Sequence, residues 1–348
     1  MISIVLKIKV LIYKLTHWEF WNSNFVYSIP TIYFLYLAIK ARSIGFFSAA
    51  NPNITNGGFG MESKFDIYQS MPNHLYPTTI FYKANEPIQP VFEQITQLGI
   101  AFPLIVKPDI GFQGKRVEKM NNRDELTHYL SNADFNVLVQ ALINYPNEIG
   151  VFYCRYPEHE KGFISGVVYK EYPSVVGDGK NTIYQLIKQN IRLYSQKELF
   201  NLSDSLYNTI LEKDEHYQLS SIGNHARGSK FIDMTNQVTP ELVHQMDLIC
   251  KAVPAFYFGR VDLKYHTLEE LGKGQNFSII EVNGAASLPT HMYDPKHSLL
   301  FAWKEMIKHY RILFQISKSN QKAGHAYLPF TKVVEMVKLH LQMVKKLN

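Results

Sequence analysis

Charged and amide side chains recur on two apolar segments in the second half of the chain. Arg260 and Asp262 lie in FYFGRVDLKY, and Glu281 and Asn283 lie in FSIIEVNGAA. Residues two apart on a strand face the same side, so each pair would project together from its strand. If the two strands are neighbours, Asp262, Glu281 and Asn283 present an all-oxygen set beside one guanidinium.

This set of residue types suits a metal ion and a phosphate. Oxygen ligands are those that Mg²⁺ prefers, and Mg²⁺ usually keeps several waters and bridges substrate phosphates. The fork of an arginine donates two hydrogen bonds to a phosphoryl group that develops charge. A surface ion pair is the commoner origin of any one such pair. Both pairs lie within apolar strands, however, and buried charges need partners, which favours a functional site.

A second group of residues surrounds a glycine-containing loop. Residues 103–107 (PLIVK) form an expected strand that ends in Lys107, and Gly111, Gln113 and Gly114 follow. The ammonium would supply charge to a polyphosphate, and the glycines would let backbone N–H groups approach its oxygens. The loop is not a Walker loop, because GxxxxGK[ST] is absent. Taken alone, an ordinary hairpin turn explains it as well.

These residues must be positioned by an irregular mixture of strands and helices. Strands are expected at residues 44–48, 78–82, 103–107, 136–140, 149–155, 162–170, 256–264 and 277–282. Helices are expected at 61–70, 87–98, 121–130, 182–190, 240–253 and 295–310. Several of these segments read as antiparallel hairpins. The pattern therefore predicts an α+β or mixed α/β fold and not a repeating βαβ unit.

The order of the motifs resembles that of the ATP-grasp ligases. The motifs are IVKPDIGFQGKRV, LVQALINYPNEIGV, GRVDLKY and IIEVNGAASLPT. D-alanine–D-alanine ligase is one likeness, and the ligase domain of cyanophycin synthetase is another, because residues 175–187 match its VVGDGK-x-TI-x-x-LI stretch. The resemblance covers roughly residues 61–310 and implies an ATP-grasp fold, in which two α+β subdomains grip ATP.

The resemblance also implies an organisation into regions. Residues 1–60 would be an atypical N-terminal region with an apolar segment, and 61–148 the N-terminal part with the lid subdomain. Residues 149–310 would be the catalytic subdomain, and 311–348 a basic amphipathic tail with a helix. The lid itself would be 102–138. The loop SAANPNITNGGFG stands where the family has a further domain, and either supplies substrate contacts or is a plain turn.

Individual roles follow from the same resemblance. Lys170 would reach the γ-phosphate of ATP, and Arg260 would stabilise the acyl phosphate. Mg²⁺, as two ions with Mn²⁺ as an alternative, would be held by Asp262, Glu281 and Asn283. ATP would be bound by residues of the loop, the hinge and the ribose side, namely Lys64, Lys107, Gly111, Gln113, Gly114, Gln140, Ala141, Leu142 and Glu148.

The implied activity is ATP-dependent joining of a small-molecule carboxylate to an amine through an acyl phosphate, assisted by positioning and by cationic charge. His225 and Arg227, in GNHARGSKF, and Ser287 are candidates for substrate contact. A solvated basic loop is the alternative for the first two. Two other functions stay open. One is phosphate transfer to a non-carboxylate acceptor, and the other is a membrane-associated nucleotide-binding protein without ligase activity.

Both termini carry apolar residues interleaved with lysines. Apolar residues recur at helical spacing over 5–15 and 333–344, and 25–39 is strongly apolar. Such helices fit burial on the body of the protein or in a homodimer, and they also fit attachment to a membrane surface. A span needs ~20 mainly apolar residues, which 20–39 reaches only by including polar positions. A cytoplasmic protein, or one on the inner face of the membrane, is expected.

Composition excludes several classes of protein. Apolar residues make up 46% of the chain and aromatic residues 14%, which is incompatible with disorder. The net charge of +6 is spread along the chain and gives no basis for nucleic-acid binding. Cys154 and Cys250 form neither a disulfide framework nor a zinc pattern, so a reducing compartment is expected.

Overall fold

The computed structural model describes residues 4–112, 114–220 and 223–347. Its smaller lobe is built on an antiparallel four-stranded sheet in the order β1-β4-β2-β3. Leu126 and Leu130 of α5 pack on this sheet against Val106 and Val139. The elements of this lobe are β1 (Thr79–Tyr82), α4 (Gln89–Gln97), β2 (Leu104–Pro108), β3 (Glu118–Met120), α5 (Arg123–Ser131) and β4 (Val137–Ala141).

The larger lobe is built on an antiparallel five-stranded sheet in the order β11-β10-β5-β6-β9. Successive side chains of β5 point to opposite faces of the sheet and so belong to two different hydrophobic cores. Val151 and Tyr153 face α9, whereas Phe152 and Cys154 face α11. The elements are β5 (Asn147–Cys154), β6 (Phe163–Glu171), β9 (Lys230–Asp233), α9 (Pro240–Ala252), β10 (Phe258–Tyr265), α10 (Leu268–Gly272), β11 (Phe277–Asn283) and α11 (Leu299–Lys322).

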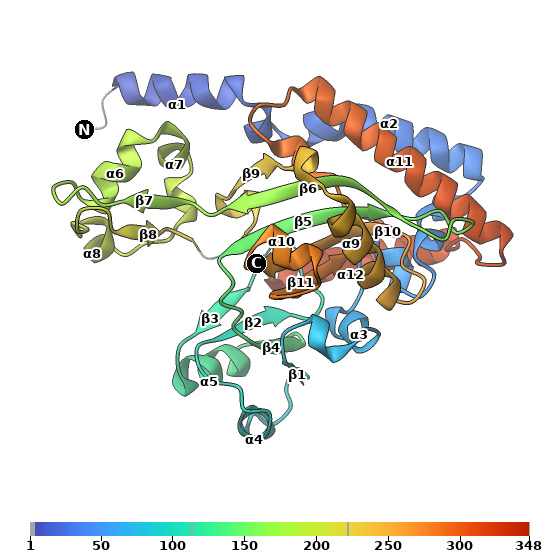
Figure 1. Cartoon of the computed structure of the whole chain (residues 1–348), viewed down its shortest axis with the longest axis horizontal. Coiled ribbons are helices and arrows are strands. Elements are labelled where there is room, and N and C mark those ends of the chain that lie inside the picture. The colour runs from blue at the N-terminus through green and yellow to red at the C-terminus, as the bar shows by residue number, and fades with distance from the viewer. Residues whose placement is uncertain (1–3, 113, 221–222, 348) are drawn as a thin grey trace.

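A small satellite extends from the larger lobe, at the left of Figure 1. It has a two-stranded sheet and a separate hydrophobic cluster that includes Ile183, Ile187 and Leu211. Leu6 and Val10 of α1 pack against this cluster. The elements are β7 (Ser174–Val176), α6 (Ile183–Gln189), α7 (Ile191–Ser195), α8 (Asp204–Tyr207) and β8 (His216–Gln218).

The N-terminal region consists of α1 (Ile4–Thr16) and α2 (Ser23–Ala41), which lie along one edge of the molecule (Figure 1). Helix α2 packs on α11. The expected strand at 44–48 is wrong, because a short 3₁₀ helix occupies Phe46–Ala50. Phe46 and Phe47 are both buried in one cluster and both contact Phe34, whereas adjacent residues of a strand would face opposite sides, so tertiary packing overrides their strand preference. Within the described residues, no helix is sufficiently long and apolar to cross a membrane.

The C-terminal helix α12 (Phe330–Leu347) contacts both lobes. Near its start, Val333 and Met336 belong to the core between α2, α11 and the large sheet. At its other end, Leu347 is buried in the core of the smaller lobe, and Met343 packs against it. Lys346 Nζ lies 3.4 Å from a carboxylate oxygen of Asp134 in the same lobe. The helix therefore bridges the two lobes.

The structure confirms the expected fold class, with mixed helices and antiparallel sheets. The remaining expected strands occur within a few residues of their predicted bounds, since apolar runs mark buried strands well. The expected helix at 61–70 is shorter, as α3 (Lys64–Gln69), because the Ser63 side chain caps it. Helix α11 begins after its cap Ser298 and continues through residue 310 to Lys322.

The glycine-rich N-terminal loop is fixed to the end of β11. Gly57 O and Gly58 O accept hydrogen bonds from the backbone N–H groups of Ala285 and Ala286, each at 3.0 Å. Gly58 has φ +75°, and a Cβ there would lie 2.6 Å from Gly284 Cα. Only glycine permits this approach of two backbones.

We therefore expect Gly58→Ala to lower the free energy of unfolding by about 2–4 kcal/mol, through strain at positive φ and a backbone collision. Gly99→Ala is the matched control, because Gly99 has φ +65° and no atom within 4 Å of the added Cβ. That variant should lose only about 1 kcal/mol. Urea unfolding measures both, and equal losses would contradict a close backbone contact at Gly58.

Candidate functional site

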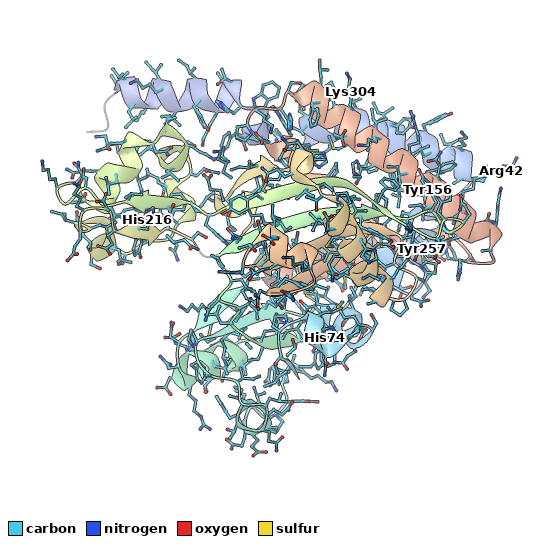
Figure 2. All side chains as sticks on the ribbon, viewed as in Figure 1. Arg42, His74, Tyr156, His216, Tyr257 and Lys304 are labelled. Atoms are coloured by element: carbon cyan, nitrogen blue, oxygen red, sulfur yellow. The ribbon has the colours of Figure 1, made fainter. Side chains whose placement is uncertain are left out.

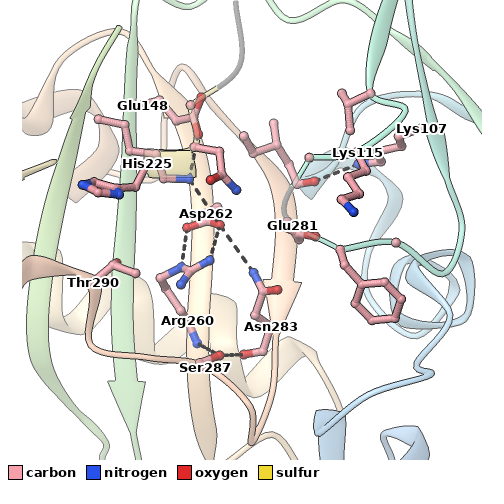
Figure 3. A pocket seen from close by; sticks show the side chains of 18 of the residues that line it. Lys107, Lys115, Glu148, His225, Arg260, Asp262, Glu281, Asn283, Ser287 and Thr290 are labelled. Carbon is pink, nitrogen blue, oxygen red and sulfur yellow. Dashed lines mark hydrogen bonds and ion pairs between the residues drawn. The ribbon is translucent and has the colours of Figure 1, made fainter. Parts of the chain in front are cut away.

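A cavity of about 1010 Å³ lies between the two lobes. The smaller lobe contributes β2, the glycine loop and the connection from β4, and the larger lobe contributes β5, β6, β10 and β11. The close view in Figure 3 shows that the expected polar residues point into this space from both sides. The cavity is therefore where the two predicted groups of residues meet.

Strands β10 and β11 are neighbours, as the first pattern required. Arg260 lies opposite Asn283, and Asp262 lies opposite Glu281. Arg260 Nε donates to Asp262 Oδ1 at 2.8 Å, and a terminal guanidinium nitrogen donates to Oδ2 at 3.0 Å (Figure 3). Asn283 Nδ2 lies 3.4 Å from Asp262 Oδ2. The four side chains therefore form one cluster on the cavity face of the sheet.

Asp262 stays charged although it is buried. Burial disfavours the carboxylate, but Arg260 and Lys170 hold its pKa below the ordinary value. Gly150, on the neighbouring strand β5, leaves the space that the pair needs. A Cβ at Gly150 would lie 2.7 Å from Asp262 Oδ1 and 3.0 Å from Arg260 Cδ.

Lys170 connects this cluster to Glu148. Its ammonium lies 2.8 Å from Glu148 Oε1 and 3.3 Å from Asp262 Oδ2. Burial disfavours the ammonium, but the two carboxylates raise the pKa of Lys170 above its ordinary value. The second oxygen of Glu148 accepts a short hydrogen bond from the Tyr172 hydroxyl. Both oxygens of Glu148 are thus engaged by protein groups.

Lys107 is buried at the end of β2 and faces neutral oxygens. Its ammonium donates to the Tyr68 hydroxyl at 2.8 Å and to Ile280 O at 2.9 Å. Burial lowers the pKa of Lys107 to about 8, although Glu281 and Asp109 oppose this shift. A second anion in the cavity would therefore stabilise the charged form of Lys107.

Lys64, at the start of α3, is a second lysine close to Glu281. Its ammonium is 3.5 Å from Glu281 Oε1 and donates to Asp109 O at 3.3 Å. Burial raises the pKa of Glu281, but Lys64 and then Lys107 outweigh it, so the pKa lies below the ordinary value. Like Asp262, Glu281 is an ionised carboxylate at neutral pH.

The glycine loop forms part of the cavity wall on the side of the smaller lobe. Gly111 and Gly114 line it, and Gly114 has φ +70°. Gln113 lies outside the described residues. A Cβ at Gly111 would lie 3.6 Å from Lys64 Nζ, so the loop backbone and the lysine are close. Phosphate binding by this loop stays a prediction.

The expected hinge connects β4 to β5 along the cavity wall. Gln140, Ala141 and Leu142 all line the cavity. The Gln140 side chain is buried and donates to Thr79 Oγ1 of β1 at 2.7 Å. The amide nitrogen of Gln140 is therefore engaged by a hydrogen bond within the smaller lobe. The cavity wall continues with the next residues of the chain, Ala141 and Leu142.

Of the three candidate substrate residues, two line the cavity and one does not. Ser287 lines the cavity, accepts from Arg260 N at 3.3 Å and donates to Asn283 O at 2.7 Å, so it ties the two site strands together. His225 also lines the cavity. Arg227 instead lines a second, smaller hollow beside Phe200 in the satellite.

Sequence reasoning missed the part of the cavity that the junction of α1 and α2 forms, whereas Gly58, Phe59 and Gly60 of the expected N-terminal loop do line the cavity. Trp18, Trp21 and Tyr27 line it. Between them, the buried Glu19 pairs with Arg192 at 2.6 Å and with His225 at 2.7 Å. One signal was available, since Glu19 is the only acidic residue before Glu62. A lone acid in a basic, apolar stretch indicates a specific buried partner.

The C-terminal helix was also missed as a wall of the cavity. His340 and Val344 of α12 line it. The His340 ring contacts the Phe112 ring of the glycine loop, with centroids 4.2 Å apart. The lysine-rich stripe predicted a helix there, but nothing local in the sequence indicated which lobe it would cover.

Comparisons with protein-family profiles and with curated proteins give no match. Solved structures that resemble the chain include D-alanine–D-alanine ligase from Bacillus anthracis, at 16% identity and TM-score 0.44, covering 75% of this chain and 69% of that one. VanG D-Ala:D-Ser ligase from Enterococcus faecalis is 16% identical with a TM-score of 0.41, and the match covers 71% of this chain and 61% of that one. A bifunctional glutathione synthetase from Pasteurella multocida is 17% identical with a TM-score of 0.36. That match covers 68% of this chain and 34% of the other, so the chain spans about a third of that protein.

Lys107 provides a test of this electrostatic arrangement. Its pKa in the folded protein, about 8, is below the ordinary lysine value of about 10.4, so the unfolded chain binds more protons between these values. The contribution of Lys107 to stability therefore rises with pH over this window, by about 3 kcal/mol in total. Wild type should gain stability relative to Lys107→Met between about pH 7 and pH 10.

Unfolding by urea across this pH range, with Lys83→Met as the control, measures the effect. Lys83 is an exposed lysine of the same lobe. The difference in stability between wild type and Lys83→Met should vary little with pH. A similarly flat difference for Lys107→Met would show that the Lys107 ammonium is not desolvated.

Proposed function

We propose that the chain is an ATP-dependent ligase that joins a carboxylate to an amine through an acyl phosphate, with Mg²⁺ as the metal. The observation that carries this proposal is the convergence of both residue groups on one cavity. Lys107 and the glycine loop reach it from the smaller lobe, and Arg260, Asp262 and Glu281 reach it from the larger lobe. The order of the sequence motifs points to the same reaction.

The cationic groups suit a triphosphate. Lys64 and Lys107 both lie near Glu281, and Lys170 and Arg260 lie near Asp262. A polyphosphate bound between the lobes would be neutralised from both sides. Backbone N–H groups of the glycine loop would bind phosphate oxygens without a side chain.

The donor set fits Mg²⁺ bound together with phosphate. Mg²⁺ typically takes one or two carboxylates and completes its shell with water and phosphate oxygens. Asp262 and Glu281 are a cross-strand pair of ionised carboxylates, and Asn283 supplies an amide next to them. Across the described ranges, no group of three or more His, Cys, Asp and Glu residues could hold a metal by itself. Phosphate oxygens would complete the site.

The reaction needs positioning and charge more than covalent catalysis. A substrate carboxylate oxygen attacks the γ-phosphorus of ATP, the bond to the bridging oxygen breaks, and ADP leaves. An amine then attacks the acyl carbon, and phosphate leaves as the amide forms. Arg260 would hold the developing negative charge, because its fork is fixed by Asp262 at 2.8 and 3.0 Å. The small lobe, closing over the cavity, would keep water away from the acyl phosphate.

The decisive assay measures ADP and phosphate release from Mg-ATP in the presence of pools of amino acids, dipeptides and polyamines. A stimulating pool should give a product lighter than its two substrates by one water in mass spectrometry. A phosphorylated product would instead assign the chain to phosphate transfer. Absence of Mg-ATP binding in calorimetry would remove the basis of the proposal.

Two variants connect the assay to the site. Glu281→Gln and Asp262→Asn should each lower the turnover rate by about 10²-fold or more, because each removes charge at the place where metal and phosphate are expected. Glu269→Gln is the matched control, since Glu269 is exposed and pairs only with Lys273 among the ion pairs of the described chain. Equal activity of Glu281→Gln and Glu269→Gln would contradict the assignment.

A further inference from the structure

Helix α1 exposes a stripe of large apolar side chains. Ile4, Ile8, Leu11 and Leu15 follow one another at helical spacing and are between 50% and 75% exposed. The opposite side of the helix packs on the satellite. The stripe is therefore not the inner face of an amphipathic helix, because that face is already covered.

Helix α2 repeats the pattern. Phe25, Ile29, Ile32 and Tyr36 follow at the same spacing and are between 43% and 64% exposed. Its inner side packs on α11. Single exposed apolar residues are normal in soluble proteins, but successive stripes on two adjoining helices indicate a contact surface. We call these eight side chains the α1–α2 face.

The charge around this face is of one sign. Lys7, Lys9 and Lys14 are exposed on α1, and Lys40 and Arg42 stand at the end of α2. Neither helix contains an aspartate or glutamate. Figure 2 shows Arg42 and Lys304, of α11, at the same edge of the molecule.

This combination fits a lipid surface better than a second copy of the chain. In a two-fold dimer a patch meets itself, so the lysines of one copy would face those of the other without acidic partners. Anionic lipid headgroups supply the missing charge, and their acyl boundary accepts the apolar side chains. No helix in the described part of the chain is fit to span a bilayer, so the helices would lie in the interface.

We propose that the α1–α2 face docks on an anionic membrane surface, with both helices lying in the plane of the interface. The junction between the helices links this surface to the cavity. Trp21 and Ser23 lie at that junction, and both also line the cavity. Docking therefore brings one end of the cavity wall to the lipid, where the half-exposed indole of Trp21 suits the headgroup region.

Flotation with vesicles tests the proposal directly. The full chain is mixed with vesicles of phosphatidylcholine alone or of phosphatidylcholine with phosphatidylglycerol, at low and at physiological salt. The protein should float with the anionic vesicles, and binding should weaken with salt. Brominated lipid should quench the fluorescence of wild type, and Trp21→Phe should lose most of this quenching.

An apolar variant tests the face itself. Ile8→Ser combined with Leu11→Ser should reduce vesicle binding at least tenfold, since two large side chains of the face no longer enter the acyl boundary. The matched control is Leu98→Ser combined with Leu248→Ser. Those leucines are similarly exposed, on the smaller lobe and on α9, and their loss should leave vesicle binding unchanged.

A charge variant tests the headgroup contribution. Lys7→Gln, Lys9→Gln and Lys14→Gln together should reduce the partition coefficient by about a hundredfold, at about fivefold for each lysine. Three exposed lysines elsewhere, Lys83, Lys119 and Lys273, serve as the control set when changed to glutamine. Equal losses for the two sets would reduce the effect to net charge and overturn the specific face.

Two other outcomes would overturn the proposal. One is absence of flotation with either vesicle type at low salt. The other is a dimer in light scattering that Ile8→Ser with Leu11→Ser dissociates, without flotation of wild type, which would make the face a contact between copies. Both outcomes leave the ligase assay unaffected, so this proposal and the proposed activity stand or fall separately.

Discussion

Asp262 is a buried carboxylate that holds two cations, and the rest of the site depends on this arrangement. Arg260 comes from its own strand and Lys170 from β6, two strands away, so three positions of the sheet meet at one carboxylate. Removing one member of a buried ionic group leaves the others without compensation. The register of β10 is therefore constrained by charge as well as by apolar burial. Gly150 on the strand between makes the approach of the side chains sterically feasible.

The smaller lobe carries a buried cation, Lys107, that has no direct carboxylate partner among the ion pairs of the described residues. Lys107 is buried against neutral oxygens, and this lowers its pKa to about 8. A group held in that state is costly to the folded protein and gains stability when an anion arrives. An anion bound in the cavity would therefore stabilise the folded protein through this one ammonium group. The larger lobe shows the complementary situation, because Lys170 is satisfied by Glu148 and Asp262.

Much of this arrangement was predictable because it depends on short-range pattern. Arg260 and Asp262, like Glu281 and Asn283, follow the two-residue period of a strand, and the apolar residues around them identify the strands. Pairing of β10 with β11 was an assumption that the register confirms. The 3₁₀ helix at Phe46–Ala50 was not predictable, because two adjacent phenylalanines are buried in one cluster whose members, such as Phe314, are far away in sequence. The contributions of Glu19 and of His340 to the cavity likewise depend on docking across more than a hundred residues.

Helix α12 places a mechanical condition on the whole molecule. It is anchored in the larger lobe through Met336 and in the smaller lobe through Leu347, and His340 lies between these anchors against the glycine loop. Because both ends of α12 are anchored, the lobes cannot rotate relative to each other unless one end of the helix slides or detaches. Relative rotation of the lobes is therefore restrained by the side chains that anchor α12, and these lie outside the ionic cluster at Asp262. Substitution of Leu347 would loosen this restraint while leaving the ion pairs of Asp262 unchanged.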